Sequence, residues 1–234
     1  MKGNGRAARA SRSRRRMWCR FYVVSLIALS PATVTSCSKT PAVDRSALLD
    51  TTRSGEPAPE VFRVRFETSR GAFVVEAHHA WSPWGVDRFY YLVRHDFYDG
   101  ARFFRAVEGS FVQFGISGDP LISAAWKERF IPDDTVQHQS NLRGRVSFGS
   151  LGPHTRTTQL FINYRDNPNL DRDYAPIGEV VLGMNVVDSL WKGYGDAPPR
   201  GNGPDQDRIL AEGEKYLARE FPKLDYIRTG RLIK

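Results

Sequence analysis

Several polar residues of this chain could do chemistry, but most of the combinations that they offer are incomplete. The adjacent pair His78 and His79 suggests metal ligands. Neighbouring residues on a strand point to opposite faces, however, and no carboxylate or cysteine spacing completes a site. Ser147, Ser150 and His154 include the residue types of a hydrolase, yet the sequence has no G-x-S-x-G nucleophile elbow. We therefore expect no metal, no covalent nucleophile and no cofactor.

A second set of residues combines a permanent positive charge, an amide and aromatic rings. Arg105 closes the triplet Phe-Phe-Arg, and Gln113 follows it by eight positions. Phe111 and Phe161 lie in nearby apolar segments. Taken singly, the arginine and the glutamine are typical of a strand surface and the phenylalanines of a core. Their chemical meaning depends on whether the fold brings them together.

The sequence around these residues predicts mostly strands. Apolar residues alternate with polar ones over 62–66 and again over 73–77, with a short glycine-containing turn between them, which predicts a β-hairpin with one buried face. After Pro83 the apolar residues recur at helical spacing, so we expect a helix that starts near Trp84 and covers the sheet.

Downstream segments continue this pattern as far as the C-terminus. We expect strands joined by tight turns over 96–119 and further strands at 145–149, 159–164, 175–181 and 224–233. We expect a helix opening at Gly183, a loop over 191–207 and a solvated helix over 209–221. Many short strands with two helices favour a closed antiparallel barrel that is capped by the helices.

The order and spacing of the motifs resemble the cyclophilin family of peptidyl-prolyl cis/trans isomerases from about Val61 to the C-terminus. The motifs are Phe103-Phe104-Arg105, Gln113, Gly144-Arg145-Val146-Ser147-Phe148, Gly152-Pro153, Gln159-Leu160-Phe161-Ile162, Leu170-Asp171 and Gly183-Met184-Asn185-Val186-Val187. The resemblance implies a mainly β fold, a closed barrel of eight antiparallel strands capped by two helices. The C-terminal loop and helix over 191–221 would be an extra insertion of unknown role.

The resemblance also implies a role for each matching residue. Arg105 stands at the position of the catalytic arginine, Gln113 at that of the substrate-orienting glutamine and Phe161 at the floor of the proline pocket. The remaining substrate-binding positions would be Phe104 at the pocket edge, Phe111 and Leu170 in its wall, Gly149 in the adjoining groove, and Tyr174 in place of a wall histidine. Ser110 and Asn169 replace pocket aromatics, which bears on inhibitor binding more than on catalysis.

These residue types suit isomerisation of a prolyl amide. The barrier to rotation is about 18–20 kcal/mol because the C–N bond has partial double-bond character. When the amide is twisted, the proline nitrogen recovers its lone pair and can accept a hydrogen bond. A guanidinium at Arg105 would stabilise that state more than the planar states, which is the condition for acceleration. An apolar cup would hold the ring.

The N-terminal region indicates export. The first 20 residues hold eight of the 34 basic residues and no acidic one, and the uncharged stretch 21–36 precedes Cys37. This is the anatomy of a signal peptide. Val34-Thr35-Ser36-Cys37 resembles the lipobox of bacterial lipoproteins, so we expect a signal with a lipobox over 1–37, a flexible tether over 38–59 and an isomerase domain over 60–234. The protein would then be membrane-anchored through lipidated Cys37 in the periplasm or cell envelope.

The charge balance limits the partners. Without the leader, 26 basic residues match the 26 acidic ones, so the folded part has no basic footprint for nucleic acid. We expect a monomer whose partners are proline-containing segments of folding proteins. The alternative to an enzyme is a catalytically weak proline-binding or chaperone module, and peptide turnover separates the two.

Overall fold

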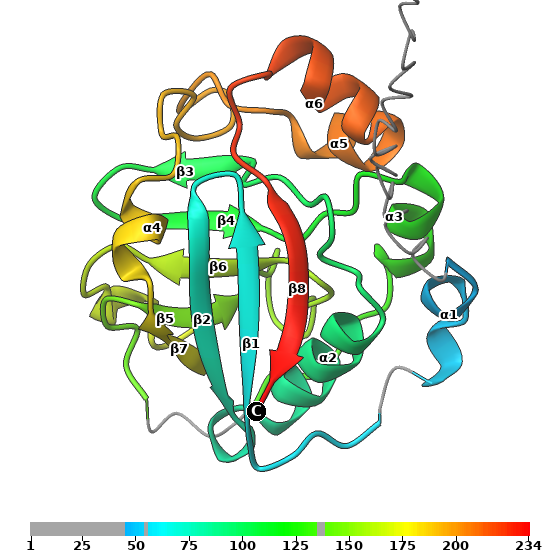
Figure 1. Cartoon of the computed structure of the whole chain (residues 1–234), viewed down its shortest axis with the longest axis vertical. Coiled ribbons are helices and arrows are strands. Elements are labelled where there is room, and N and C mark those ends of the chain that lie inside the picture. Colours follow the sequence, from blue (N-terminus) through cyan, green and yellow to red (C-terminus); the bar gives the residue numbers. More distant parts are fainter. Residues whose placement is uncertain (1–44, 54–55, 135–138) are drawn as a thin grey trace, which may run out of the picture. The chain divides into compact units, whose positions relative to one another are not determined.

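The computed structural model describes residues 45–53, 56–134 and 139–234 (Figure 1). The predicted signal, the lipobox at Cys37 and the first part of the predicted tether lie outside these residues. Within the described ranges, no helix combines the length and the apolar character needed to cross a membrane.

The elements follow one another in a mixed order, with most helices short. The helices are α1 (Arg45–Leu49), α2 (Pro83–Arg94), α3 (Pro120–Trp126), α4 (Met184–Asp188), α5 (Gln206–Glu212) and α6 (Glu214–Glu220), with 3-10 turns η1 (Thr51–Arg53), η2 (His79–Trp81) and η3 (Pro168–Leu170). The strands are β1 (Val61–Thr68), β2 (Gly71–His78), β3 (Arg105–Val107), β4 (Phe111–Phe114), β5 (Arg145–Phe148), β6 (Leu160–Asn163), β7 (Pro176–Leu182) and β8 (Ile227–Ile233).

All eight strands form one antiparallel sheet in the order β3-β4-β6-β5-β7-β2-β1-β8, which confirms the predicted fold class. The sheet curls, so that β1, β2 and β8 cross in front of β3, β4, β6 and β5 (Figure 1). Its edges β3 and β8 do not form a ladder. The residues just before β3 and β8 join the two edges of the sheet. Arg102 and Tyr226 form an isolated β-bridge, and the Phe103 amide donates a hydrogen bond of 3.0 Å to the Asp225 carbonyl.

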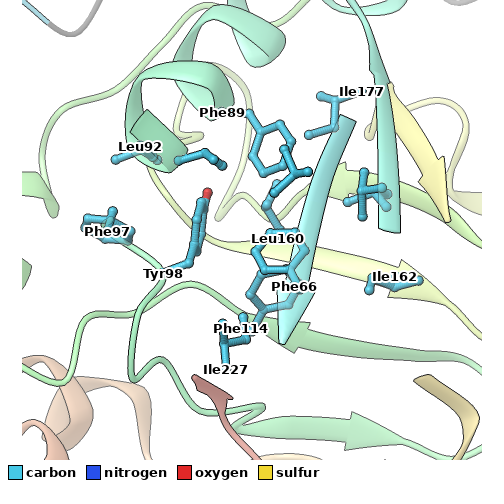
Figure 2. Close-up of a cluster of buried hydrophobic side chains, with 14 of the residues drawn as sticks. Phe66, Phe89, Leu92, Phe97, Tyr98, Phe114, Leu160, Ile162, Ile177 and Ile227 are labelled. Atoms are coloured by element: carbon cyan, nitrogen blue, oxygen red, sulfur yellow. The ribbon is translucent and has the colours of Figure 1, made fainter. Parts of the chain in front are cut away.

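The core lies between the curled sheet and α2 (Figure 2). Alternate residues of β1 are buried, and Phe66 stacks on Phe73 of β2 with ring centroids 5.1 Å apart. Helix α2 contributes Val86 and Phe89, both fully buried, as its apolar spacing predicted. Tyr98 and Phe114 each meet Phe66 edge-on, so that aromatic and aliphatic side chains share the interior.

The structure differs from the predicted tether at residues 45–53. Helix α1 packs on the domain, Leu48 is 1% exposed, and the Trp126 indole donates a 2.7 Å hydrogen bond to the Leu48 carbonyl. Tyr91 donates a hydrogen bond to the Ala47 carbonyl. A five-residue helix is too short to show a period, and its burial depends on α3, a helix that the sequence interpretation missed. The N-cap signal of α3 was nevertheless present, because Asp119 precedes Pro120 and accepts from the Leu121 amide.

The single solvated helix predicted over 209–221 is also wrong. The helix breaks at Gly213, where the backbone has φ +60° and an added Cβ would collide with the Gly118 carbonyl oxygen. Helices α5 and α6 instead bury an apolar face. Their contribution to a second cluster is Ile209, Tyr216 and Leu217, which pack with Phe104, Ile116 and Leu224.

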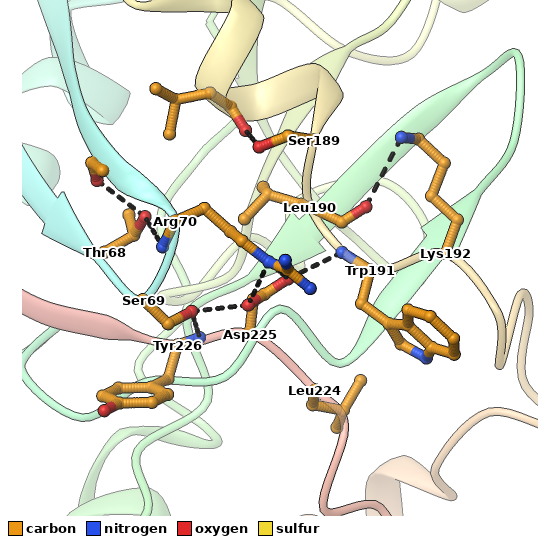
Figure 3. A network of polar contacts seen from close by, with 12 residues as sticks. Thr68, Ser69, Arg70, Ser189, Leu190, Trp191, Lys192, Leu224, Asp225 and Tyr226 are labelled. Carbon is orange, nitrogen blue, oxygen red and sulfur yellow. Dashed lines mark hydrogen bonds and ion pairs between the residues drawn. The ribbon is translucent and has the colours of Figure 1, made fainter.

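Asp225 ties the two ends of this C-terminal insertion to the sheet (Figure 3). Its carboxylate is buried and accepts from the Ser69 hydroxyl at 2.6 Å and the Arg70 guanidinium at 2.9 Å, both in the β1–β2 turn. It also accepts from the Trp191 amide at 2.7 Å. One carboxylate therefore fixes the hairpin turn, the start of the insertion and its return to β8.

We expect Asp225→Ala to lower the free energy of unfolding by about 1–3 kcal/mol, because the substitution removes three hydrogen bonds to a buried, charged acceptor. Urea unfolding followed by circular dichroism would measure it. Glu128→Ala is the matched control, since that side chain is 77% exposed at the end of α3, and its effect should stay within about 0.5 kcal/mol. Equal effects of the two substitutions would contradict the proposed anchoring role.

Candidate active site

A groove of about 670 Å³ lies on the outer face of β3, β4 and β6. It is lined by most of the residues singled out from the sequence: Arg105, Phe111, Gln113, Gly149, Phe161, Leu170 and Tyr174. The sheet register explains how they meet. Arg105 pairs across the strands with Gln113, and Gln113 pairs with Phe161. Residues directly opposite in an antiparallel sheet share a face, so these three form one row.

Strand β4 divides its side chains between the groove and the core. Phe111 and Gln113 line the groove, whereas Val112 and Phe114 are buried in the hydrophobic core. This alternation is the ordinary period of a strand. The core residues thereby fix the strand that presents the functional ones.

A chain of hydrogen bonds orients the polar residues. The Arg105 guanidinium donates from Nη1 to Gln113 Oε1 at 3.0 Å, and Gln113 Nε2 donates to Gln159 Oε1 at 2.7 Å. A Cβ at Gly149 would come within 3.1 Å of Gln113 Nε2, so glycine leaves room for the amide. Sequence interpretation did not assign Gln159 a role, although it lies in the same motif as Phe161, two positions earlier.

Aromatic rings form a cup beside the guanidinium. Phe111 and Phe161 have ring centroids 5.4 Å apart, and Tyr174 meets Phe161 edge-on at 5.4 Å. The Arg105 guanidinium carbon lies 4.8 Å from the Phe111 ring centroid, within cation–π range. Leu170 closes the cup from η3. The cup can hold a small apolar ring next to a fixed cation.

Phe104 does not lie at the edge of this pocket, contrary to the expectation from sequence. It is 2% exposed and belongs to the second cluster beneath α5 and α6. Phe104 precedes Arg105 in the chain and points to the other side, where the insertion covers it. Ser110 and Asn169, the two residues expected to replace pocket aromatics, also lie outside the lining of the groove.

Asp196, like Gln159, is a site residue that the sequence interpretation missed. It comes from the insertion loop and accepts from Arg105 Nε at 2.6 Å and from Nη2 at 3.2 Å. Burial raises the pKa of the Asp196 carboxyl, but the hydrogen bonds and charge of Arg105 outweigh burial and hold the pKa below its usual range. The two residues are 91 positions apart, and no local pattern connects them.

The competing chemistries are not assembled in the part of the chain that the structure describes. No group of three or more His, Cys, Asp or Glu side chains there could hold a metal ion. Ser147 is fully buried and donates to Asn141 Oδ1 at 2.9 Å, while His154 is an exposed residue that contacts Asp133. Ser147 and His154 therefore serve the structure, whereas Ser150 lines the groove.

Comparison with known proteins identifies the family. The model described as "Cyclophilin type peptidyl-prolyl cis-trans isomerase/CLD" matches residues 63–211. The human and mouse proteins named peptidyl-prolyl cis-trans isomerase-like 3 are each 31% identical over 134 residues, which cover 55% of this chain and 81% of theirs. A peptidyl-prolyl cis-trans isomerase of Arabidopsis thaliana is 32% identical over 126 residues, covering 50% and 76% respectively.

Solved structures agree at the level of the fold. A cyclophilin type peptidyl-prolyl cis-trans isomerase of Cryptosporidium parvum superposes with a TM-score of 0.57 at 20% identity, over 74% of this chain and 98% of that one. A second crystal structure of that protein, obtained in the presence of the dipeptide Ala-Pro, gives a TM-score of 0.56. Family model, relatives and fold coincide: the chain belongs to the cyclophilin-type peptidyl-prolyl cis-trans isomerases.

Proposed function

We propose that this protein catalyses cis/trans isomerisation of X-Pro bonds in peptides, with Arg105 stabilising the twisted amide. The observation that carries the proposal is the guanidinium held at the rim of an aromatic cup, where it contacts both Gln113 and the face of Phe111. A proline ring seated on Phe161 would place its nitrogen close to the remaining guanidinium donors.

The Arg105 guanidinium has N–H groups left to donate to a substrate. A guanidinium carries five N–H groups. Three of them are engaged, by Asp196 at Nε and Nη2 and by Gln113 at Nη1. One N–H therefore remains on each terminal nitrogen. Arginine stays protonated at any working pH, so these donors do not depend on a titration.

The proposed reaction breaks no covalent bond, so it requires neither a nucleophile nor a metal ion. The groove needs only to bind the proline ring and to offer a hydrogen-bond donor to its nitrogen. The uncatalysed step takes roughly tens to hundreds of seconds because of the amide barrier. Hydrogen bonding to the pyramidal nitrogen lowers the barrier only if the bond is absent from the planar states. Gln113 is held by Gln159 and Arg105, and in this proposal its amide orients the peptide groups on either side of the proline.

We also propose that the protein is exported and acts on exported proteins as a lipid-anchored isomerase. The support comes from the sequence: a basic N-terminus, an uncharged stretch over 21–36 and Cys37 after small residues. The anchor would restrict the enzyme to clients that fold near a membrane surface.

For the catalytic role, we expect Arg105→Ala to lower kcat/KM on an Ala-Pro peptide by about a hundredfold, the usual effect of losing a transition-state donor. A protease-coupled or NMR exchange assay would measure it. Arg143→Ala is the control, since Arg143 forms an exposed ion pair with Asp188 outside the groove, and its activity should match that of the native protein. If the native domain bound the peptide without accelerating its isomerisation, the protein would be a proline-binding module instead.

For the anchor, we expect metabolic labelling with a radioactive fatty acid to mark the full-length protein and to disappear in Cys37→Ser. Cys19→Ser is the matched control, because Cys19 is the only other cysteine in the sequence, and it should keep the label. Label that persists in Cys37→Ser would exclude Cys37 as the lipidated residue.

A further inference from the structure

The insertion over 191–221 extends the domain beyond its barrel and includes α5 and α6. We infer that Asp196 in this insertion is a positioning residue for Arg105, so that the insertion completes the active site. The inference rests on the proposed function.

The contact between the two residues is close and well shielded. The Asp196 carboxylate accepts two hydrogen bonds from one edge of the Arg105 guanidinium, at 2.6 Å from Nε and 3.2 Å from Nη2. The exposed fractions of the two side chains are 19% for Arg105 and 12% for Asp196. A pair with this fork geometry is directional, unlike an exposed ion pair. It fixes the plane of the guanidinium as well as its position.

The insertion loop holds Asp196 through its backbone. Gly195 accepts a hydrogen bond from the Ala106 amide, which places Asp196 opposite Arg105 at the open edge of β3. The Asp196 carbonyl accepts from the Gly203 amide at 2.8 Å. Gly201 packs so closely on the same carbonyl that an added Cβ would collide with it. The carboxylate is therefore presented by a loop whose conformation is fixed by its own backbone contacts.

The rest of the insertion supports this loop. Tyr194 packs edge-on against Phe221 at 5.1 Å, at the margin of the second hydrophobic cluster. The Asp205 amide at the start of α5 donates to the Tyr216 hydroxyl of α6 at 3.1 Å. Asp225 fixes the point at which the insertion leaves the barrel, by accepting from the Trp191 amide. Helices α5 and α6 thus support the loop that carries Asp196.

The arrangement orients the arginine without blocking it. Asp196 occupies one edge of the guanidinium, and with the bond to Gln113 counted, one N–H remains on Nη1 and one on Nη2. Arg200 also contacts the carboxylate, with its Nε 3.0 Å from Oδ2. The three groups together carry one net positive charge. The cluster therefore stays attractive to a developing lone pair, and the lowered pKa of Asp196 keeps its carboxylate ionised at neutral pH.

The test compares Asp196→Ala and Asp196→Asn with the native full-length protein on an Ala-Pro peptide. We expect Asp196→Ala to lower kcat about tenfold with KM within about twofold, because a misplaced group affects the reacting geometry more than ground-state binding. Asp196→Asn, which keeps the shape and one acceptor, should lose less. Thermal unfolding of both variants shows whether they fold. Asp188→Ala, which breaks the bidentate pair with Arg143 outside the groove, should leave kcat unchanged.

A double-mutant cycle gives the readout that a merely structural role would not produce. If Asp196 acts through Arg105, then adding Asp196→Ala to Arg105→Ala should cost no further activity. The inference is overturned if Asp196→Ala leaves kcat unchanged or raises it, or if the two losses multiply in the double variant. Absence of activity in the native protein would instead refute the proposed function itself, which keeps the two failures distinct.

Discussion

The register between β3, β4 and β6 is the constraint on which the site depends. It places Arg105, Gln113 and Phe161 opposite one another on one face, while Val112 and Phe114 on the other face anchor β4 in the core. A slip of one residue in β3 and β4 would turn Arg105 and Gln113 towards the core and would turn Val112 and Phe114 towards the groove. Core packing and site geometry are therefore two consequences of the same hydrogen-bond ladder.

The edge of this ladder is where the insertion becomes important. Strand β3 has three residues, and its free side would otherwise expose unpaired backbone groups beside Arg105. The insertion covers it with a backbone hydrogen bond from Ala106 to Gly195, and the next residue, Asp196, meets Arg105. Protection of the edge and orientation of the guanidinium come from adjacent residues of one loop, which gives the extra segment a structural reason to lie there.

The proposed reaction explains why such a simple set of groups would suffice. Rotation about an amide needs neither a proton transfer nor a nucleophile, so the groove combines a permanent cation, amides and apolar rings. The carboxylate in contact with the cation has a pKa below its usual range, because Arg105 and Arg200 surround it.

The sequence by itself determined most of the strand pattern and the antiparallel class, because alternation is local and survives in one dimension. The order of its motifs carried the resemblance to the family, which implied most of the predicted groove residues. The sequence interpretation missed α3, although the N-cap signal of that helix was present, and it placed Phe104 at the pocket edge. Only the tertiary structure decided that Phe104 is buried under α5 and α6, that Leu48 folds onto Trp126, and that Asp196 reaches Arg105. Each of these depends on segments distant in the chain meeting when the sheet curls, and burial or ion pairing of that kind leaves no periodic trace in the sequence.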